Sequence, residues 1–152
     1  MILIQNGRVL DPVTNTDQVL DVLLDESGIL KTGEHLEAEG ADVIDASGLV
    51  VAPGLMDAHV HFRDPGLTYK EDIFTGAAAA ARGGFTTVVC MANTKPTVDN
   101  VEILHQVQEK GEKALIHVLQ AAAISKGLKG EELTDMEALA EAGAAGFTDD
   151  GI

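Results

Sequence analysis

Two histidines separated by one residue have the spacing of metal ligands. Alternate side chains of a β-strand project from the same face, so His59 and His61 are expected to point the same way. Asp57 and Arg63 fall on the same predicted face. At about 3.3 Å per residue the two imidazoles stand roughly 6.6 Å apart along the strand, so their ring nitrogens can converge on one cation. Neutral imidazole suits zinc, and a metal with an open coordination position activates water for hydrolysis.

The bare His-X-His pattern also fits two surface histidines that happen to alternate. The position at the carboxyl end of a strand favours a site, because barrel and open-sheet proteins build their sites there. Arg63 follows at the same end, and its planar guanidinium is suited to bind a carboxylate through two hydrogen bonds. A surface ion pair with Asp64 or Glu71 is the alternative role for Arg63.

Polar residues follow two later apolar runs at the equivalent position. Asn93 offers two donors and an acceptor to a small polar ligand, although asparagine is also an ordinary loop residue. Asp149 and Asp150 precede a glycine, where they either supply a carboxylate to the same metal or form an Asp-Gly turn. All three motifs are predicted at the same end of successive strands, and this shared position favours a common site.

The hydrophobic pattern predicts the elements that would position these residues. Residues 1–50 contain short apolar runs between turn residues such as Asn6-Gly7, which predicts a small β-rich unit. Residues 51–152 alternate strand-like and helical stretches, which predicts parallel βα units. A closed (β/α)₈ barrel takes about 250 residues. The expected fold class is therefore α/β, with the first half of a TIM-type barrel after a small β-rich segment.

Individual elements in this second part can be predicted from strand-like runs and helix caps. Strands are expected over residues 49–61 (interrupted at Pro53-Gly54), 86–92, 114–123 and 144–148, and helices over 71–82 and 99–110. A third, short helix is expected after a capping box formed by Thr134 and Glu137, and Gly143 would end it.

Composition restricts the class of partner. The chain has 25 acidic and 10 basic residues and a formal charge of −15, which argues against binding to nucleic acid or to an anionic membrane. No signal peptide or membrane-spanning run is recognisable, and the single cysteine, Cys90, lies in an apolar stretch. These features predict a cytoplasmic protein that does not bind nucleic acid or a membrane.

The segment around the two histidines resembles the first-strand signature of dihydroorotases, within the cyclic amidohydrolase superfamily. Residues 53–66 read PGLMDAHVHFRDPG. The FRDPG part is shared by fewer families than His-X-His alone, so it is the more specific motif. Three further segments look like successive motifs of the bacterial class I enzymes: ARGGFTT at 81–87, MANT at 91–94 and GFTDDG at 146–151. One departure is Ala92, where the family usually has proline.

The resemblance implies a zinc enzyme with one or two ions, in which His59, His61 and Asp150 are metal ligands. It assigns Arg63 and Asn93 to the substrate carboxylate. Family members interconvert dihydroorotate and N-carbamoyl-L-aspartate in pyrimidine biosynthesis. The resemblance further implies that the first segment belongs to a small β-sandwich subdomain. The catalytic aspartate and two further histidine ligands are expected beyond the last residue of this chain, which itself holds no catalytic residue.

The chain is accordingly expected to be the N-terminal part of such an enzyme and to be inactive alone. An allantoinase, hydantoinase or dihydropyrimidinase is the alternative enzyme, and a non-catalytic assembly module is the alternative from another class. Open strand edges in an incomplete barrel would favour a homodimer or other association through those edges.

Overall fold

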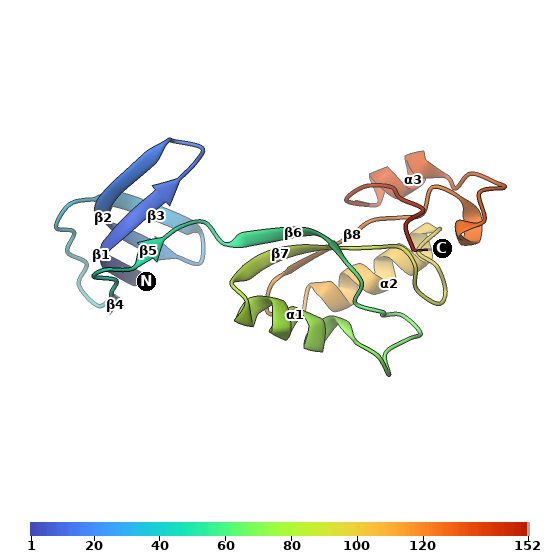
Figure 1. Ribbon diagram of the computed structural model, residues 1–152, viewed down its shortest axis with the longest axis horizontal. Helices are drawn as coiled ribbons and strands as arrows, with labels where there is room; N and C mark the ends of the chain where they lie inside the picture. Colours follow the sequence, from blue (N-terminus) through green and yellow to red (C-terminus); the bar gives the residue numbers. More distant parts are fainter. Residues whose placement is uncertain (152) are drawn as a thin grey trace. The chain divides into compact units, whose positions relative to one another are not determined.

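Strands alone form the regular structure of the first third of the chain, and helices begin only after it (Figure 1). The computed structural model describes residues 1–151. The chain divides into two units, one formed by residues 1–53 and one that begins at Gly54. None of the helices in the described chain is long and apolar enough to cross a membrane.

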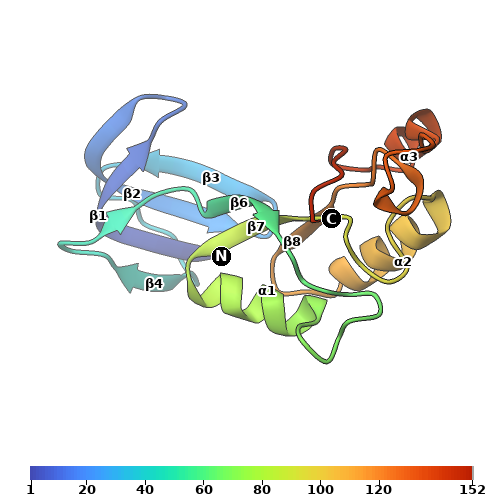
Figure 2. The same cartoon turned by 45° about the vertical axis from the view of Figure 1, so that its right-hand side comes forward.

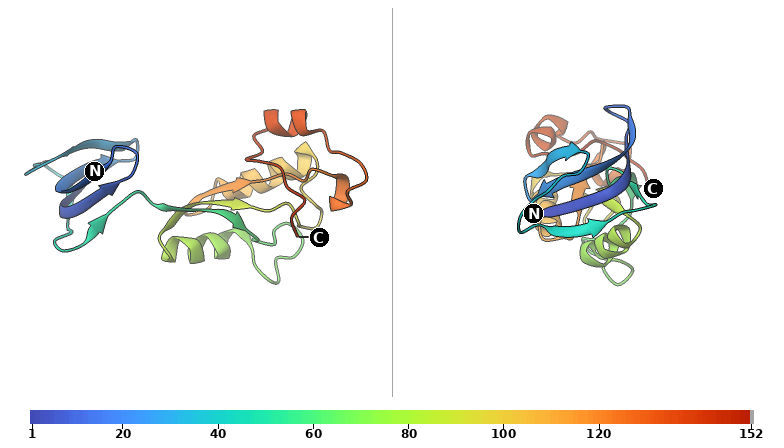
Figure 3. Two further views of the ribbon diagram at one scale, coloured as in Figure 1. Left: turned by 45° about the horizontal axis from the view of Figure 1, so that its top comes forward. Right: turned by 90° about the vertical axis from the view of Figure 1, so that its left-hand side faces the viewer.

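The first unit is one five-stranded sheet, which confirms the prediction of a β-rich N-terminal part (Figure 3). Its strands are β1 (Ile2–Asp11), β2 (Thr16–Asp25), β3 (Gly28–Gly33), β4 (Asp42–Asp45) and β5 (Val50–Val51). The order is β3-β2-β1-β4, and β5 also pairs with β1. β1 and β3 run antiparallel to β2, whereas β4 and β5 run parallel to β1.

Asn6 lies in a bulge of β1, and the interpretation of Asn6-Gly7 as turn residues between two short strands is wrong. The pairing register with β2 shifts between Ile4 and Gly7, and Asn6 has a φ of 62°. Asparagine tolerates this left-handed conformation, so the strand continues past the irregularity. The backbone N–H of Asn6 donates to Asp21, a buried carboxylate that also accepts from the N–H of Leu36.

The second unit alternates strands and helices. Its elements are β6 (Leu55–Val60), α1 (Ile73–Arg82), β7 (Phe85–Cys90), α2 (Val101–Gly111), β8 (His117–Gln120), the 3₁₀ turn η1 (Lys126–Leu128) and α3 (Met136–Glu141). β6, β7 and β8 form a parallel sheet in that order, and this confirms the predicted parallel β/α segment. Helices α1 and α2 lie against β7 and β8 respectively and contact each other (Figures 1 and 2).

The run predicted over 49–61 forms β5 and β6, and its predicted interruption at Pro53-Gly54 is confirmed. Another predicted strand differs from the structure. The strand predicted over 144–148 is reduced, within the described residues, to one parallel bridge between Ala122 and Phe147. The parallel sheet of the described chain therefore has three strands.

The start of α3 also differs from the prediction. Asp135 is the N-cap and its carboxylate accepts from the N–H of Ala138. The hydroxyl of Thr134 donates instead to the carbonyl of Ala123, in the segment that follows β8. The side chain of Thr134, which was expected to cap the helix, thus connects the start of α3 to the segment after β8.

The core of the second unit lies where α1 and α2 meet the sheet. Its largest fully buried apolar side chains are Ile73, Leu104, Leu139, Val88 and Val98. Cys90, at the end of β7, is also buried, and burial raises the pKa of its thiol to about 12. Several large apolar side chains of this unit remain exposed, namely Leu55, Met56, Leu115 and Leu119.

Candidate metal centre

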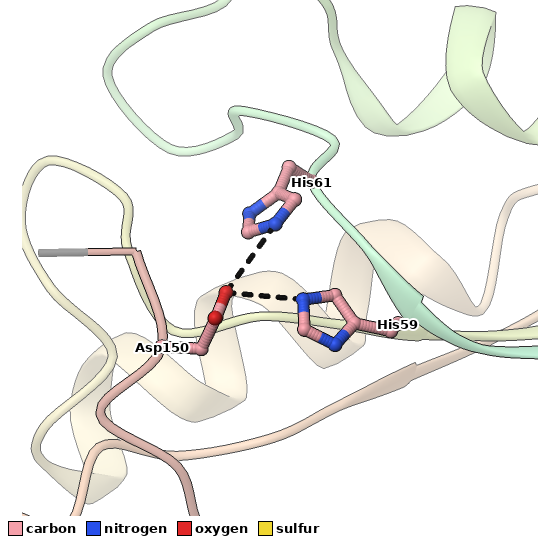
Figure 4. Close-up of side chains that lie close together, drawn as sticks. All are labelled: His59, His61 and Asp150. Atoms are coloured by element: carbon pink, nitrogen blue, oxygen red, sulfur yellow. Dashed lines mark hydrogen bonds and ion pairs between the residues drawn. The ribbon is translucent and has the colours of Figure 1, made fainter.

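Three predicted ligands converge at the carboxyl end of β6 (Figure 4). The Nε2 atoms of His59 and His61 lie 3.0 Å and 3.4 Å from Oδ2 of Asp150. One ligand atom from each residue lies within 4.8 Å of the others. His59 lies in β6 and His61 follows two positions later, directly after the strand, while Asp150 approaches from the end of the described chain. Residues that are 91 positions apart thus form one cluster.

β6 ends at Val60, so the strand geometry does not extend to Arg63. Both imidazoles still face Asp150, with ring centroids 5.2 Å apart and planes at 60°. Arg63 has a φ of 59°, which takes its backbone out of the extended conformation. The expectation that Arg63 shares a strand face with the histidines is therefore wrong, and within the described residues its guanidinium forms no ion pair.

Asn93 lies beside the cluster, in the loop after β7. Its Oδ1 is 2.8 Å from Nδ1 of His61, and its Nδ2 donates weakly, at 3.4 Å, to the carbonyl of Gly151. Gly151 has a φ of +93°, and a Cβ there would lie 1.9 Å from the Asn93 amide nitrogen. The structure thus brings Asn93 together with the three predicted ligands, whereas Arg63 makes no hydrogen bond with them in the described chain.

Asp149 points away from the cluster and fixes the loop that carries Asp150. Its carboxylate accepts from the hydroxyl of Ser125 at 2.6 Å and from the N–H groups of Ile124 and Ser125 at 2.9 and 3.0 Å. These bonds, of which the hydroxyl bond is the strongest influence, hold the pKa of Asp149 below its usual value. The sequence predicted the acidic pair but carried no local signal for the contribution of Ser125.

An ion pair with a buried carboxylate fixes the loop that carries His61. The carboxylate of Asp64 is only 3% exposed, and Nζ of Lys110 in α2 lies 2.6 Å from it. Asp64 therefore does not pair with Arg63, the alternative considered from the sequence. The contact joins residues 46 positions apart, so nothing in the local sequence predicts it.

The loop after β6, which carries His61 and Asp64, packs against the loop after β7. The N–H of Lys95 donates to the carbonyl of Pro65 at 3.1 Å. Gly66 has a φ of +84°, and a Cβ there would lie 1.7 Å from the carbonyl oxygen of Lys95. No other residue fits this position without a backbone shift, so the two loops support each other directly.

The donor set fits a zinc ion or a related transition metal. Two imidazole nitrogens and one carboxylate oxygen are ligands that zinc accepts, and their mutual spacing allows them to share one ion. All three side chains keep some exposure, so a fourth position is open to a small ligand. The arrangement is suited to polarise a carbonyl and to activate water.

Comparison with known sequences decides the family. The sequence profile of the Dihydro-orotase-like family matches residues 48–152, which include every residue of the cluster. The chain belongs to this family. The dihydroorotase of Clostridioides difficile is 61% identical over 153 residues, and that of Streptococcus pneumoniae serotype 4 is 59% identical over 152 residues. Both alignments cover the whole chain but only 36% of the relative, so the chain spans about a third of the length of these curated relatives.

Solved structures support the fold of this family member. An L-hydantoinase (dihydropyrimidinase) from Arthrobacter aurescens superimposes with a TM-score of 0.79 at 22% identity, over 96% of this chain and 32% of that one. A dihydroorotase crystal structure gives 0.68 at 19% identity, over 97% of this chain and 42% of that one. At these identities the likeness concerns the fold, and it covers both the β-rich sheet and the parallel β/α segment.

Proposed function

We propose that this chain supplies the first part of a zinc-dependent dihydroorotase. In this proposal the β-rich unit is part of a small β-sandwich subdomain, and the second unit is the first part of a (β/α)₈ barrel. The identity of about 60% to two dihydroorotases supports the activity. The exposed apolar side chains of β6 and β8, such as Met56 and Leu119, are available to pack against further barrel elements.

The convergence of His59, His61 and Asp150 is the observation that carries the proposal. These residues would hold the zinc ion. When bound, zinc supplies Lewis-acid polarisation of the amide carbonyl and activation of water. The chain's own contribution is to bring two imidazoles and a carboxylate into one cluster and to hold them there through Asp149 and Asn93.

Arg63 and Asn93 are proposed to bind the carboxylate of the substrate, dihydroorotate or N-carbamoyl-L-aspartate. A guanidinium presents parallel N–H donors to a carboxylate, and the asparagine amide adds another donor. The Arg63 side chain is partly exposed and unpaired within the described residues, so it is available to an anionic ligand.

Zinc titration of the purified chain tests the metal site. We expect His59→Ala, His61→Ala or Asp150→Ala to weaken zinc binding by about 100-fold or more, since each removes one ligand of three. His105→Ala is the matched control, because His105 is an exposed histidine of α2 outside the cluster. Equal zinc affinity of the His105 and His59 variants would contradict the proposed site.

A chimera tests the reaction. In it, this chain replaces the corresponding 153 residues of the Clostridioides difficile relative. We expect metal-dependent turnover of dihydroorotate, and Arg63→Glu should abolish it by repelling the substrate carboxylate. A substrate panel with dihydrouracil, hydantoin and allantoin addresses the alternative enzymes. Preference for an uncharged ring, with dihydroorotate turnover unaffected by Arg63→Glu, would contradict the carboxylate assignment.

A further inference from the structure

We infer that Asn93 is a positioning residue for His61. Its hydrogen bond to Nδ1 favours the imidazole tautomer that can bind a metal ion, and the same bond orients the Asn93 amide toward the substrate. The inference rests on the proposed function only for the identity of the ligands. It adds that the side chain of Asn93 both positions a metal ligand and binds the substrate.

The hydrogen bond between Asn93 and His61 determines where the imidazole proton lies. The amide oxygen Oδ1 only accepts hydrogen bonds, and it lies 2.8 Å from Nδ1 of His61. With Oδ1 as the acceptor, this bond favours the tautomer in which Nδ1 carries the proton. In a neutral imidazole the other nitrogen, Nε2, is then unprotonated, and this atom faces Asp150 in the cluster. The bond thus presents the lone pair of His61 to the metal position.

The same bond determines which way the amide of Asn93 points. With Oδ1 engaged by His61, the NH₂ group is left on the opposite side, where its one partner in the described chain is the carbonyl of Gly151 at 3.4 Å. That contact is long, so the NH₂ group remains available to a better acceptor. Asn93 accordingly offers donors alone to a ligand and selects an acceptor such as a carboxylate oxygen.

The loop around Asn93 is fixed, as a positioning role requires. Met91, Ala92 and Thr94 are buried on either side of it, and the hydroxyl of Thr94 donates to the carbonyl of Pro96 at 2.7 Å. On the far side of the amide, Gly151 leaves no space, since a Cβ there would contact Nδ2. The amide is therefore pre-organised between His61 and the Gly151 backbone.

Two substitutions at Asn93 separate the two roles. Asn93→Asp keeps an oxygen acceptor for Nδ1 of His61 but loses the donors, whereas Asn93→Ala loses both. On the 152-residue chain we expect Asn93→Ala to weaken zinc binding, measured by competition with a chromogenic chelator, by about tenfold. Asn93→Asp should bind zinc at least as tightly as the parent chain. Circular dichroism confirms that each variant is folded.

A metal-free measurement tests the tautomer directly. Long-range ¹H–¹⁵N correlation spectra of the metal-free chain are recorded in an Asp150→Ala background, because the Asp150 carboxylate, 3.4 Å from Nε2 of His61, otherwise competes for the proton. In that background we expect the Nδ1-protonated form of His61 with Asn93 or Asn93→Asp, and a mixture of tautomers with Asn93→Ala. An unchanged tautomer in Asn93→Ala, together with unchanged zinc affinity, overturns the inference. If the parent chain binds no zinc, the proposed function fails, and the tautomer spectra still decide the role of Asn93.

The chimera tests the substrate side. Asn93→Asp should keep its zinc but raise the KM for dihydroorotate at least about tenfold, because a carboxylate repels the substrate carboxylate and offers it no donor. A zinc-loaded Asn93→Asp chimera with the parental KM would overturn the proposed orientation of the amide.

Discussion

The turn at Asp25 in the β-rich unit is self-contained, whereas the loops at the carboxyl ends of the parallel strands are held by contacts with one another. Asp25 and Asp149 show the contrast, because each accepts from a serine hydroxyl at 2.6 Å. The partner of Asp25 is Ser27, two residues away in the same turn, while the partner of Asp149 is Ser125, in another loop. The same interaction therefore closes a turn in one unit and joins two loops in the other.

Ion pairs follow the same division. Arg8 and Asp17 pair at 2.7 Å across neighbouring strands with both side chains more than half exposed. Asp64 and Lys110 pair at 2.6 Å between a loop and a helix with the carboxylate buried. The candidate metal centre therefore depends on contacts between several loops. A substitution in one loop is expected to displace residues that another loop contributes.

The largest expected effect concerns Gly66. Gly66→Ala should destabilise the second unit by about 3 kcal/mol or more, because the residue has a positive φ and its Cβ would overlap the carbonyl of Lys95. Gly28→Ala is the matched control in the first unit: its φ is also positive, at +124°, but the space around it is open. We expect a loss of about 1 kcal/mol for the control. Urea unfolding measures both, and equal losses would remove the distinction between the two kinds of loop.

The next effect concerns the ion pair between Lys110 and the buried carboxylate of Asp64. Lys110→Met should cost about 2–3 kcal/mol, since it leaves the Asp64 carboxylate buried without its partner, and the partial exposure of Lys110 keeps the loss below that of a fully buried pair. Arg8→Met removes the exposed pair and should leave the unfolding midpoint almost unchanged. A similar shift of the midpoint in the two variants would show that burial does not separate these pairs.

A smaller effect is expected on metal binding when Asp149 is replaced. Asp149→Ala should weaken zinc binding about tenfold, because the loop that positions Asp150 loses three hydrogen bonds to Ile124 and Ser125. Asp25→Ala removes an equivalent carboxylate from a turn of the first unit and should leave zinc affinity as it was. Isothermal titration calorimetry compares the two, and parental affinity in Asp149→Ala would show that Asp150 holds its place without this anchor.

The smallest effect is a local response to acid. Hydrogen bonds from Ser27 lower the pKa of Asp25, and the backbone N–H of Thr75 is the main influence that lowers the pKa of Asp72, the N-cap of α1. Because both folded-state pKa values lie below the ordinary 3.8, these carboxylates stabilise the fold fully above about that pH. The contribution is lost as the pH falls through the folded-state values.

Amide chemical shifts at Ser27 and Thr75 report these two protonation steps. We expect protonation of Asp25 to affect its own turn alone, and protonation of Asp72 to loosen the first turn of α1. Transitions above the ordinary carboxyl range would contradict the direction of the pKa shifts.

Local signals in the sequence predicted most of the elements. The helix predicted over 71–82 ends at Arg82 before Gly83, and the one predicted over 99–110 begins beside its Asn100 cap, because caps and glycines act within one turn. The two-residue period of a strand indicated that His59 and His61 point the same way. The short helix α3 was misplaced at its start because Thr134 and Asp135 are both good caps, and the hydroxyl of Thr134 is used by the neighbouring strand segment.

The remaining features depend on contacts that no window of sequence contains. The positive φ of Arg63 accompanies packing of its loop against the loop after β7, and the sequence pattern treated it as the next residue of a strand. Ser125 and Lys110 bond acids from other loops, so neither is marked by its neighbours in the chain. The assignment of His59, His61 and Asp150 as metal ligands, and of Arg63 and Asn93 as substrate contacts, stays a prediction for the experiments above.

The reactivity of the Cys90 thiol can be used to measure how often the parallel sheet of the second unit opens. The thiol is 4% exposed at the end of the central strand β7, and its pKa of about 12 leaves almost none of it as thiolate at neutral pH. An alkylating reagent therefore modifies it only when β7 separates from its neighbours. Since Cys90 is the one cysteine in the chain, the rate of labelling follows the opening of this sheet without any introduced probe.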